Sequence, residues 1–192
     1  MRAPRLLALA LVLSLLGPGP LVASDESDLA ILSSYRSLMG VNARPRLRAH
    51  AGIDIAAPAG TPVLAAAAGT VFLLIDYEPG CGVGVVLAHP PFARWTAYCH
   101  LTRALVSRGQ DVGRGQPIGL SGTSGNAAHV PHVHLEVCTS ACGSHPDGDL
   151  RGTQDPETLL VGCFDAARSY PTDRLALTWP LACRRDAAAA RQ

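Results

Sequence analysis

His132-Val133-His134-Leu135-Glu136-Val137 is the stretch that decides the fold and points to the chemistry. Polar and apolar residues alternate strictly along it, which is typical of a strand buried on one face. Side chains two apart on a strand share a face, so the two histidines and Glu136 point away from the three apolar residues. The histidine Cα atoms would lie roughly 6.5 Å apart, which lets one histidine bind a metal ion while the other reaches a water on it. The same pattern also fits a solvated strand face, so this stretch alone does not distinguish a metal site from an ordinary surface strand.

Short apolar runs separated by Gly and Pro follow one another through the middle of the chain. They cover residues 62–64, 71–75, 83–87, 95–101, 117–120 and 133–137. Such spacing, without long helical periods, predicts a mainly β fold, either an antiparallel two-sheet sandwich or a partly open barrel. The stretches 60–71 and 109–119 echo each other as strand, glycine turn and return strand, so we expect duplicated hairpins.

The two ends of this β region have a different character. Leu29, Leu32, Tyr35 and Met39 recur near helical spacing, which predicts a short N-terminal helix over residues 27–39. Beyond the β region we expect a small C-terminal extension with a helix over 157–167, a last strand over 175–179 and a frayed tail from residue 184.

The first 24 residues have the pattern of a secretory signal peptide. Arg2 and Arg5 precede a mostly apolar run from Leu6 to Leu16, and Gly, Pro and small residues follow up to Ser24. The run is too short to span a bilayer and has the length of a signal-peptide core. We therefore expect an exported mature chain without a transmembrane segment. The periplasm is the preferred location, and the extracellular space is the alternative.

Cysteine usage agrees with export. An even number of cysteines in an exported chain favours disulfides over free thiols. We predict three pairs, one across a hairpin, one within a loop and one near the end: Cys81–Cys99, Cys138–Cys142 and Cys163–Cys183.

The charge balance excludes two classes of partner. All basic residues are arginines, and two of the sixteen lie in the leader, so the remainder has a formal charge of 14 − 15 = −1. A near-neutral chain gives no support to binding of nucleic acid or of an anionic membrane.

His50 and Asp54 form a second pair of metal-ligand residue types. Gly52 and the β-branched neighbours of Asp54 disfavour a helix, and on a straight strand the pair would lie roughly 13 Å apart. Joint metal binding therefore requires a bend, for which Gly52 is suited. With one histidine of the 132/134 pair, they would give zinc three ligands and leave the fourth position to water, as in catalytic sites.

A third candidate is His100, within the alternating run 96–101. Alternation places Thr96, Tyr98 and His100 on one strand face. His100 can therefore face the same cleft.

In combination, these segments resemble the lysostaphin-type (LytM-type) zinc endopeptidases, which cut peptide bonds in bacterial peptidoglycan. The family's patterns H-x-x-x-D, Y-x-H-L and H-x-H followed by an apolar residue and Glu stand here at residues 50–54, 98–101 and 132–136, in the same order. The resemblance runs from about Arg46 to Val137. It departs at Val130 and Leu135, where Gly and Phe are common, and no tyrosine shortly precedes His50.

The resemblance implies a role for each site residue. His50, Asp54 and His134 would bind one Zn²⁺ per chain, and His100 and His132 would be catalytic residues beside the metal-bound water. Glu136 is a candidate for orienting a histidine. The implied reaction is hydrolysis of peptidoglycan stem peptides or cross-links by a zinc-activated water.

The chain accordingly divides into a signal peptide (1–24), an N-terminal helix and linker (25–45), a zinc peptidase domain (46–160) and a C-terminal extension with a frayed tail (161–192). Two alternatives stay open: a catalytically silent cell-wall binding or amidase-activator protein with the same fold, and a secreted zinc protease that cleaves Gly-rich proteins. No separate wall-binding domain is recognisable, which leaves room for an unidentified targeting partner.

Overall fold

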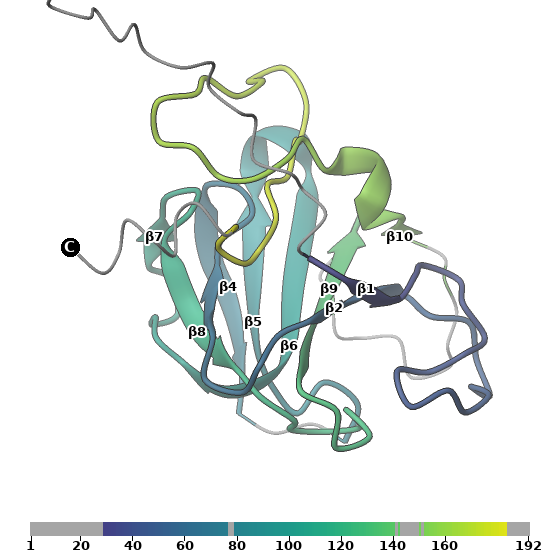
Figure 1. The fold of residues 1–192 in the computed structure, drawn as a ribbon. Coiled ribbons are helices and arrows are strands. Elements are labelled where there is room, and N and C mark those ends of the chain that lie inside the picture. Colours follow the sequence, from purple (N-terminus) through teal and green to yellow (C-terminus); the bar gives the residue numbers. More distant parts are fainter. Residues whose placement is uncertain (1–28, 77–78, 141, 143–149, 151, 184–192) are drawn as a thin grey trace, which may run out of the picture.

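The computed structural model describes residues 29–76, 79–140, 142, 150 and 152–183. It confirms the prediction of a mainly β, antiparallel fold (Figure 1). The predicted leader and the tail from residue 184 lie outside the described residues. Within the described part of the chain, no helix has the length and apolar character needed to cross a membrane.

Ten strands form one connected sheet in the order β1-β2-β9-β6-β5-β4-β7, with β10 beside β9 and with β8 between β6 and β3. Short 3₁₀ helices follow β5 and β10. The elements are β1 (Ile31–Ser33), β2 (Gly52–Ala56), β3 (Pro62–Leu64), β4 (Gly69–Ile75), β5 (Val83–His89), η2 (Pro90–Phe92), β6 (Arg94–Ala104), β7 (Asp111–Val112), β8 (Pro117–Ser121), β9 (His132–Cys138), β10 (Thr153–Gln154) and η3 (Pro156–Leu159).

Of the two predicted architectures, the two-sheet sandwich is not confirmed, because the strands form one sheet and β6 runs through both parts of it. Residues 95–99 of β6 pair with β9, whereas residues 101–104 pair with β8. His100 lies between these two parts with φ of 63°. Opposite it, Val85 pairs with Tyr98 and Val83 with Leu101, so two residues of β6 face the single residue Gly84. This β-bulge bends β6, so that the single sheet changes direction at His100.

The predicted duplicated hairpins are also wrong in their pairing. Strand β3 pairs with β8, with Val63 opposite Gly119, and β4 pairs with β7, with Gly69 opposite Val112. Each segment of the sequence echo therefore supplies two strands that pair with the strands of the other segment. The echo identified four real strands, but sequence similarity carries no information on which strands pair.

The predicted N-terminal helix is replaced by an edge strand over the residues that the structure describes. Strand β1 pairs with β2, with Ile31 opposite Ile55 and Ser33 opposite Asp54. Leu29 and Ile31 pack against the core, whereas Leu32 is exposed. Burial thus alternates with a period of two, because the available edge of β2 satisfies the backbone of this segment better than its weak helical period does.

The core lies between the curved sheet and the C-terminal segment. Its fully buried side chains include Ile53, Leu87, Tyr98 and Leu135 from the sheet, and Leu177 from the C-terminal segment. Figure 1 shows this last segment folding back over the strands. Apolar side chains of the extension therefore complete the core of the β domain.

The regular elements predicted for the extension are largely wrong. The helix expected over 157–167 is limited to η3, whose first turn is capped by the Asp155 side chain. The strand expected over 175–179 is limited to one isolated bridge between Leu160 and Leu177. The backbone of this segment instead bonds to neighbouring loops, as in the 2.8 Å contact from Thr178 N to Ala66 O. The apolar residues of the C-terminal segment are therefore buried without forming a regular helix or strand.

The three predicted disulfides are confirmed: Cys81–Cys99, Cys138–Cys142 and Cys163–Cys183. The first joins the start of β5 to β6 beside the bulge, and the last ties the C-terminal extension to itself. Closing a loop of about 20 residues stabilises a fold by roughly 3 kcal/mol in the chain-entropy model.

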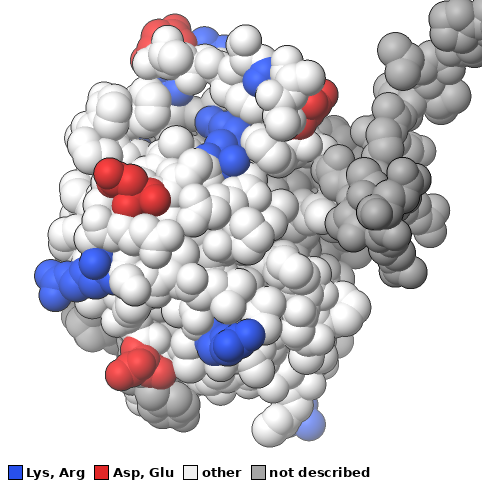
Figure 2. All heavy atoms as spheres, turned by 90° about the vertical axis from the view of Figure 1, so that its left-hand side faces the viewer, with Lys and Arg blue, Asp and Glu red and all other residues white. Residues whose placement is uncertain are grey.

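Charged side chains are distributed evenly over the face that Figure 2 shows. Arginines and acidic residues lie singly and interspersed there, without a basic patch. This face agrees with the near-neutral net charge of the sequence.

Candidate metal centre

Strands β2 and β9 bring the sequence motifs together. Asp54 lies directly opposite His134 in the antiparallel register, Ala56 opposite His132, and Gly52 opposite Glu136. His50 precedes β2, and the chain bends at Ala51, one residue before the position that the sequence suggested, so that the His50 side chain returns towards Asp54. The structure thus brings together all five predicted site residues.

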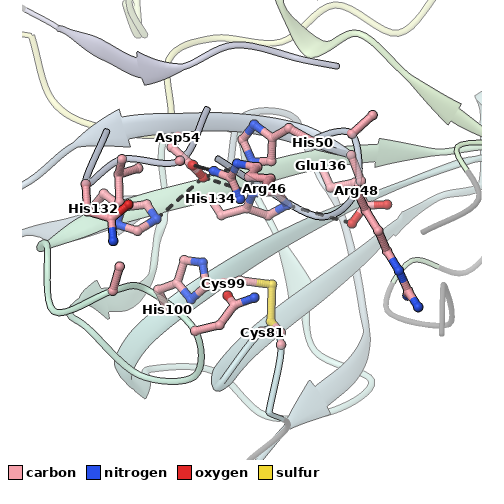
Figure 3. A pocket seen from close by; sticks show the side chains of 18 of the residues that line it. Arg46, Arg48, His50, Asp54, Cys81, Cys99, His100, His132, His134 and Glu136 are labelled. Carbon is pink, nitrogen blue, oxygen red and sulfur yellow. Dashed lines mark hydrogen bonds and ion pairs between the residues drawn. A yellow bond between two sulfur atoms is a disulfide. The ribbon is translucent and has the colours of Figure 1, made fainter. Parts of the chain in front are cut away.

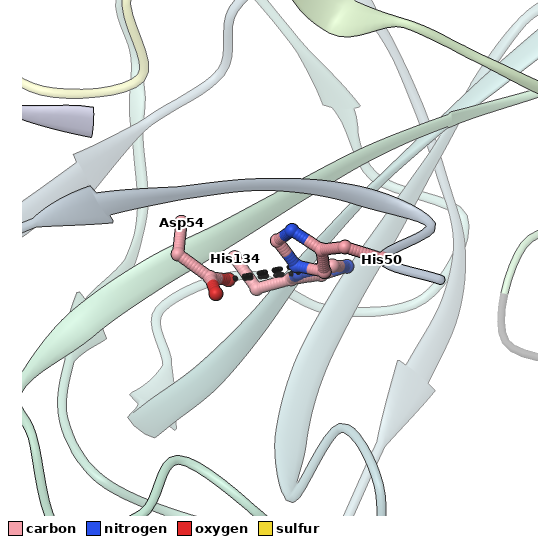
Figure 4. Close-up of side chains that lie close together, drawn as sticks. All are labelled: His50, Asp54 and His134. Carbon is pink, nitrogen blue, oxygen red and sulfur yellow. Dashed lines mark hydrogen bonds and ion pairs between the residues drawn. The ribbon is translucent and has the colours of Figure 1, made fainter. Parts of the chain in front are cut away.

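The atoms His50 Nε2, Asp54 Oδ1 and His134 Nδ1 form a nearly equilateral triangle (Figure 4). His50 Nε2 lies 2.9 Å from His134 Nδ1 and 3.1 Å from Asp54 Oδ1, and His134 Nδ1 lies 3.0 Å from Asp54 Oδ1. Tetrahedral zinc with bonds of about 2.0 Å needs ligand atoms about 3.3 Å apart. Two imidazole nitrogens and one carboxylate oxygen are also the ligand types that zinc prefers, so these residues fit the ion.

Neighbouring groups fix the orientation of the two triad histidines. His50 Nδ1 lies 3.1 Å from Ser34 O, and donation of its N–H to this carbonyl leaves the lone pair on Nε2. His134 presents Nδ1 to the triad, and its Nε2 lies 3.8 Å from Glu136 Oε2. Glu136 is therefore placed to orient His134, as the sequence suggested. Such partners select the ring nitrogen that faces a metal.

His100 and His132 lie on the other side of Asp54, with their ring centroids 4.6 Å apart (Figure 3). His100 Nδ1 lies 2.9 Å from Ser124 O, and His132 Nδ1 lies 2.7 Å from Val130 O. Each backbone carbonyl accepts the Nδ1–H, which leaves the lone pair of each neutral ring on Nε2. His132 Nε2 lies 3.5 Å from Asp54 Oδ1. Both rings thus present Nε2 next to the triad.

The prediction that Tyr98 shares a face with His100 is wrong. Tyr98 is fully buried in the core, where its hydroxyl accepts a 2.9 Å hydrogen bond from Ala66 N. The bulge at His100 breaks the alternation, so Cys99 and His100 both line the pocket. Without the extra residue, His100 would point into the core with Tyr98.

The protein groups of the triad favour a cation. Burial opposes ionisation of Asp54, but the neighbouring imidazoles of His132, His134 and His50 hold its pKa well below the usual value. Burial alone would lower the pKa of His134, but its hydrogen bond to Asp54 and the nearby carboxylate of Glu136 raise it to about 9. The negative potential that holds a proton on His134 also attracts a metal ion, which would displace that proton.

The five site residues line a pocket of about 700 Å³ (Figure 3). The segment 40–51 forms one side of it, and residues from β2, β6 and β9, from the segment before β5 and from the loop before β9 form the remainder. Sequence analysis gave no role to Arg46, whose guanidinium lies 2.6 Å from Asp54 Oδ2. The spacing of Arg46 from Asp54 contains no signal for this contact, because it depends on the path of the loop before β2.

Replacement of Gly52 by alanine is expected to damage the site through packing. The added Cβ would overlap the carbonyl oxygen of Leu135 and would lie 2.9 Å from His134 Cε1. We expect a loss of about 1–3 kcal/mol in the free energy of unfolding and a reduced zinc content, measured by urea denaturation and metal analysis. Gly113→Ala is the matched control, because a Cβ there meets nothing within 4 Å. Equal stability of the two variants would contradict this account.

The metal-free protein is expected to lose stability as the pH falls from about 7 to 4. Burial lowers the pKa of His100 to about 3, and burial also lowers the pKa values of His50 and His89 below 6.5. At a pH between the folded-state and the unfolded-state pKa of such a histidine, the unfolded chain binds more protons than the folded protein. The free energy of unfolding therefore decreases as the pH falls through this range. His134 acts oppositely: its contribution is fully present below 6.5 and is lost as the pH rises through about 9.

This pH dependence is measured by urea denaturation of chelator-treated protein between pH 4 and 9. His89 lies away from the metal centre, where its Nδ1 lies 2.8 Å from Ala68 O and its Nε2 2.9 Å from Thr96 Oγ1. His89→Asn should therefore reduce the acid slope without changing the alkaline one. Constant or rising stability from pH 7 to 4 would show that these histidines are not buried in the neutral form.

Comparison with known proteins identifies the family. A sequence profile described as Peptidase family M23 matches residues 48–146, just over half of the chain. The chain belongs to peptidase family M23, which confirms the resemblance found in its motifs.

Among curated relatives, the peptidoglycan DD-endopeptidase ShyA of Vibrio cholerae is 42% identical over 92 residues, which are 48% of this chain and 21% of that protein. The DD-carboxypeptidase/endopeptidase Mpg of Neisseria meningitidis is 39% identical over 90 residues, which are 47% of this chain and 20% of that protein. The chain thus spans about a fifth of the length of these relatives.

Two solved structures have a similar fold. The catalytic domain of the prophage-encoded M23 protein EnpA from Enterococcus faecalis, solved as a mutant, is 32% identical with a TM-score of 0.53, covering 68% of this chain and 91% of that one. A zinc-containing peptidase from Vibrio cholerae is 33% identical with a TM-score of 0.50, covering 58% of this chain and 34% of that one.

Proposed function

We propose that this protein is an exported zinc metalloendopeptidase that hydrolyses peptide bonds in the stem peptides or cross-links of peptidoglycan. His50, Asp54 and His134 hold one Zn²⁺ per chain. The observation that carries the proposal is the convergence of their three ligand atoms within 2.9–3.1 Å of one another. Membership of a family that includes a zinc-containing peptidase supports the choice of metal.

Zinc in this triad supplies a Lewis acid that lowers the pKa of water and polarises a peptide carbonyl. The remaining chemistry belongs to the protein. Three protein ligands leave room for solvent, which suits a catalytic rather than a structural site. A serine or cysteine nucleophile is therefore not needed, and all six cysteines are in disulfides.

His100 and His132 are the residues that move protons. Both rings present Nε2 towards the reaction side because their Nδ1–H groups are donated to backbone carbonyls. Burial lowers the pKa of His100 to about 3, so this ring is neutral at working pH and can accept a proton from water only transiently. A proton taken by one of these imidazoles is then returned to the leaving amine.

The proposed substrate and the proposed cellular location rest on separate observations. Relatives that share the matched segment have names that specify peptidoglycan DD-endopeptidase activity. The leader pattern and the three disulfides support export to an oxidising compartment, for which we propose the periplasm. The pocket is large enough for a peptide segment, and targeting to the wall is left to this pocket or to a partner.

Digestion of purified sacculi by the zinc-loaded protein tests the proposal. Chromatography and mass spectrometry of the soluble products should show muropeptides cut at a peptide bond, and a chelator should abolish their release. An intact sugar backbone and new amino termini would distinguish peptidase from glycosidase activity. A zinc-loaded protein that pellets with sacculi but releases no fragments would instead support the silent, wall-binding alternative.

A further inference from the structure

Arg46 lies beside Asp54, on the side of the metal centre that the N-terminal segment forms (Figure 3). Its Nη2 lies 2.6 Å from Asp54 Oδ2, whereas Asp54 Oδ1 faces His50 and His134. The Asp54 side chain is only 2% exposed and that of Arg46 is 26% exposed. The two oxygens of one buried carboxylate are therefore assigned to different partners.

The guanidinium itself is held in place by the edge of the sheet. Arg46 Nε donates to Met39 O at 3.3 Å, and Nη2 lies 3.4 Å from Ser33 Oγ. Ser33 lies on β1 opposite Asp54 and donates its hydroxyl to Met39 O at 2.8 Å. Strand β1 and the loop after it thus fix Arg46 in the geometry that contacts Asp54 Oδ2.

A carboxylate can bind a metal ion through one oxygen or through both. A guanidinium N–H group that donates to one carboxylate oxygen makes that oxygen a poorer ligand, because a lone pair of the oxygen accepts the hydrogen bond. We propose that Arg46 is a positioning residue that restricts Asp54 to one-oxygen coordination and so preserves a four-coordinate zinc site. The inference rests on the metal site of the proposed function.

Arg46 and the residues that hold it in place lie in a part of the chain outside the family match. The match begins at residue 48, whereas Arg46, Ser33 and Met39 all precede it. The same segment also supplies Ser34 O, which orients His50. The N-terminal segment therefore contacts two of the three candidate ligands, His50 and Asp54.

A purely structural ion pair is the competing explanation. In that case Arg46 would tether the loop, and its loss would lower stability without changing how the metal is bound. Coordination number separates the two explanations, because visible absorption of Co²⁺ is strong in four-coordinate sites and weaker when a further ligand binds.

The test is the visible spectrum of the Co²⁺-substituted full chain, compared at equal cobalt occupancy. We expect Arg46→Met to lose molar absorbance severalfold, since Asp54 Oδ2 becomes free to bind. Arg46→Lys retains a cation for this oxygen and should restore most of the absorbance. Arg44→Met is the matched control, because this exposed arginine in the same loop makes no contact with Asp54, and it should have the wild-type spectrum.

A wild-type spectrum in Arg46→Met, or an equal loss in Arg44→Met, would overturn the proposal. The outcome is independent of turnover. Wild-type protein that binds cobalt but releases no peptide from sacculi would refute the proposed function and leave the role of Arg46 intact. Active wild-type protein with an unchanged Arg46→Met spectrum would refute only the role of Arg46.

Discussion

Replacing His134 with alanine is expected to abolish both zinc binding and peptide hydrolysis. His134 Nδ1 lies within 3.0 Å of the candidate ligand atoms of both His50 and Asp54, so its loss opens one corner of the triad. Two remaining ligands hold zinc poorly, and without the Lewis acid we expect kcat/KM on a peptide substrate to fall by at least about 10³-fold. Metal analysis and a continuous peptidase assay on the same samples measure both effects.

A suitable control for this variant is His129→Asn. His129 is an exposed histidine near β9 with φ of 61°, a conformation that asparagine tolerates better than alanine. This variant should retain one zinc per chain and the wild-type rate. A zinc-loaded, active His134→Ala protein would remove His134 from the proposed ligand set.

Removal of either histidine proposed for proton transfer, His100 or His132, is expected to separate metal binding from turnover. His132→Ala and His100→Asn should each retain one zinc per chain but lower kcat by about 10²–10⁴-fold, the usual contribution of a general acid or base. Asparagine is chosen at position 100 because the backbone φ there is 63°. The comparison requires metal content and kcat from the same preparation.

The two histidine variants have clear contrary outcomes. Loss of zinc in His132→Ala would make His132 a ligand, which its 3.5 Å distance from Asp54 Oδ1 leaves geometrically accessible. Retention of full kcat in both variants would mean that the ring pair has no part in proton transfer. Similar losses in the single and double variants would indicate that the two rings act as a unit.

The strand pattern of the sequence located the site but not its surroundings. Strict alternation around His134 predicted β9 and the face that its histidines share. The need for a bend between His50 and Asp54 also followed from the sequence, which placed it at Gly52, whereas the structure has it at Ala51. The pairing of β2 with β9 could not be predicted, since register depends on contacts between distant segments.

The errors have a common physical origin in tertiary pairing. The stretch from Leu29 to Met39 has a weak helical period. Its residues Ile31–Ser33 nevertheless pair with the open edge of β2 and form β1. At His100, a left-handed residue inserts a bulge into β6, and no glycine or asparagine signals it. Tyr98 therefore joins the core although alternation placed it beside His100. Arg46 was missed for the same reason, because its contact with Asp54 exists only once β1 and the loop are in place.

Local chemistry was predicted better than topology. Each cysteine pair was assigned from hairpin, loop or chain-end proximity, and the structure contains all three. The longest of these loops spans 20 residues, so little of the fold had to be known. Metal-ligand residue types are similarly local signals, whereas the geometry that unites them is not.

The central claim is that one zinc ion is bound by His50, Asp54 and His134. The most direct measurement is a crystal structure of the zinc-loaded protein with anomalous diffraction recorded above and below the zinc edge. We predict a single strong peak about 2.0–2.2 Å from His50 Nε2, His134 Nδ1 and Asp54 Oδ1. Absence of a peak at this triad in protein soaked with zinc, or a peak bound by other residues, would contradict the account.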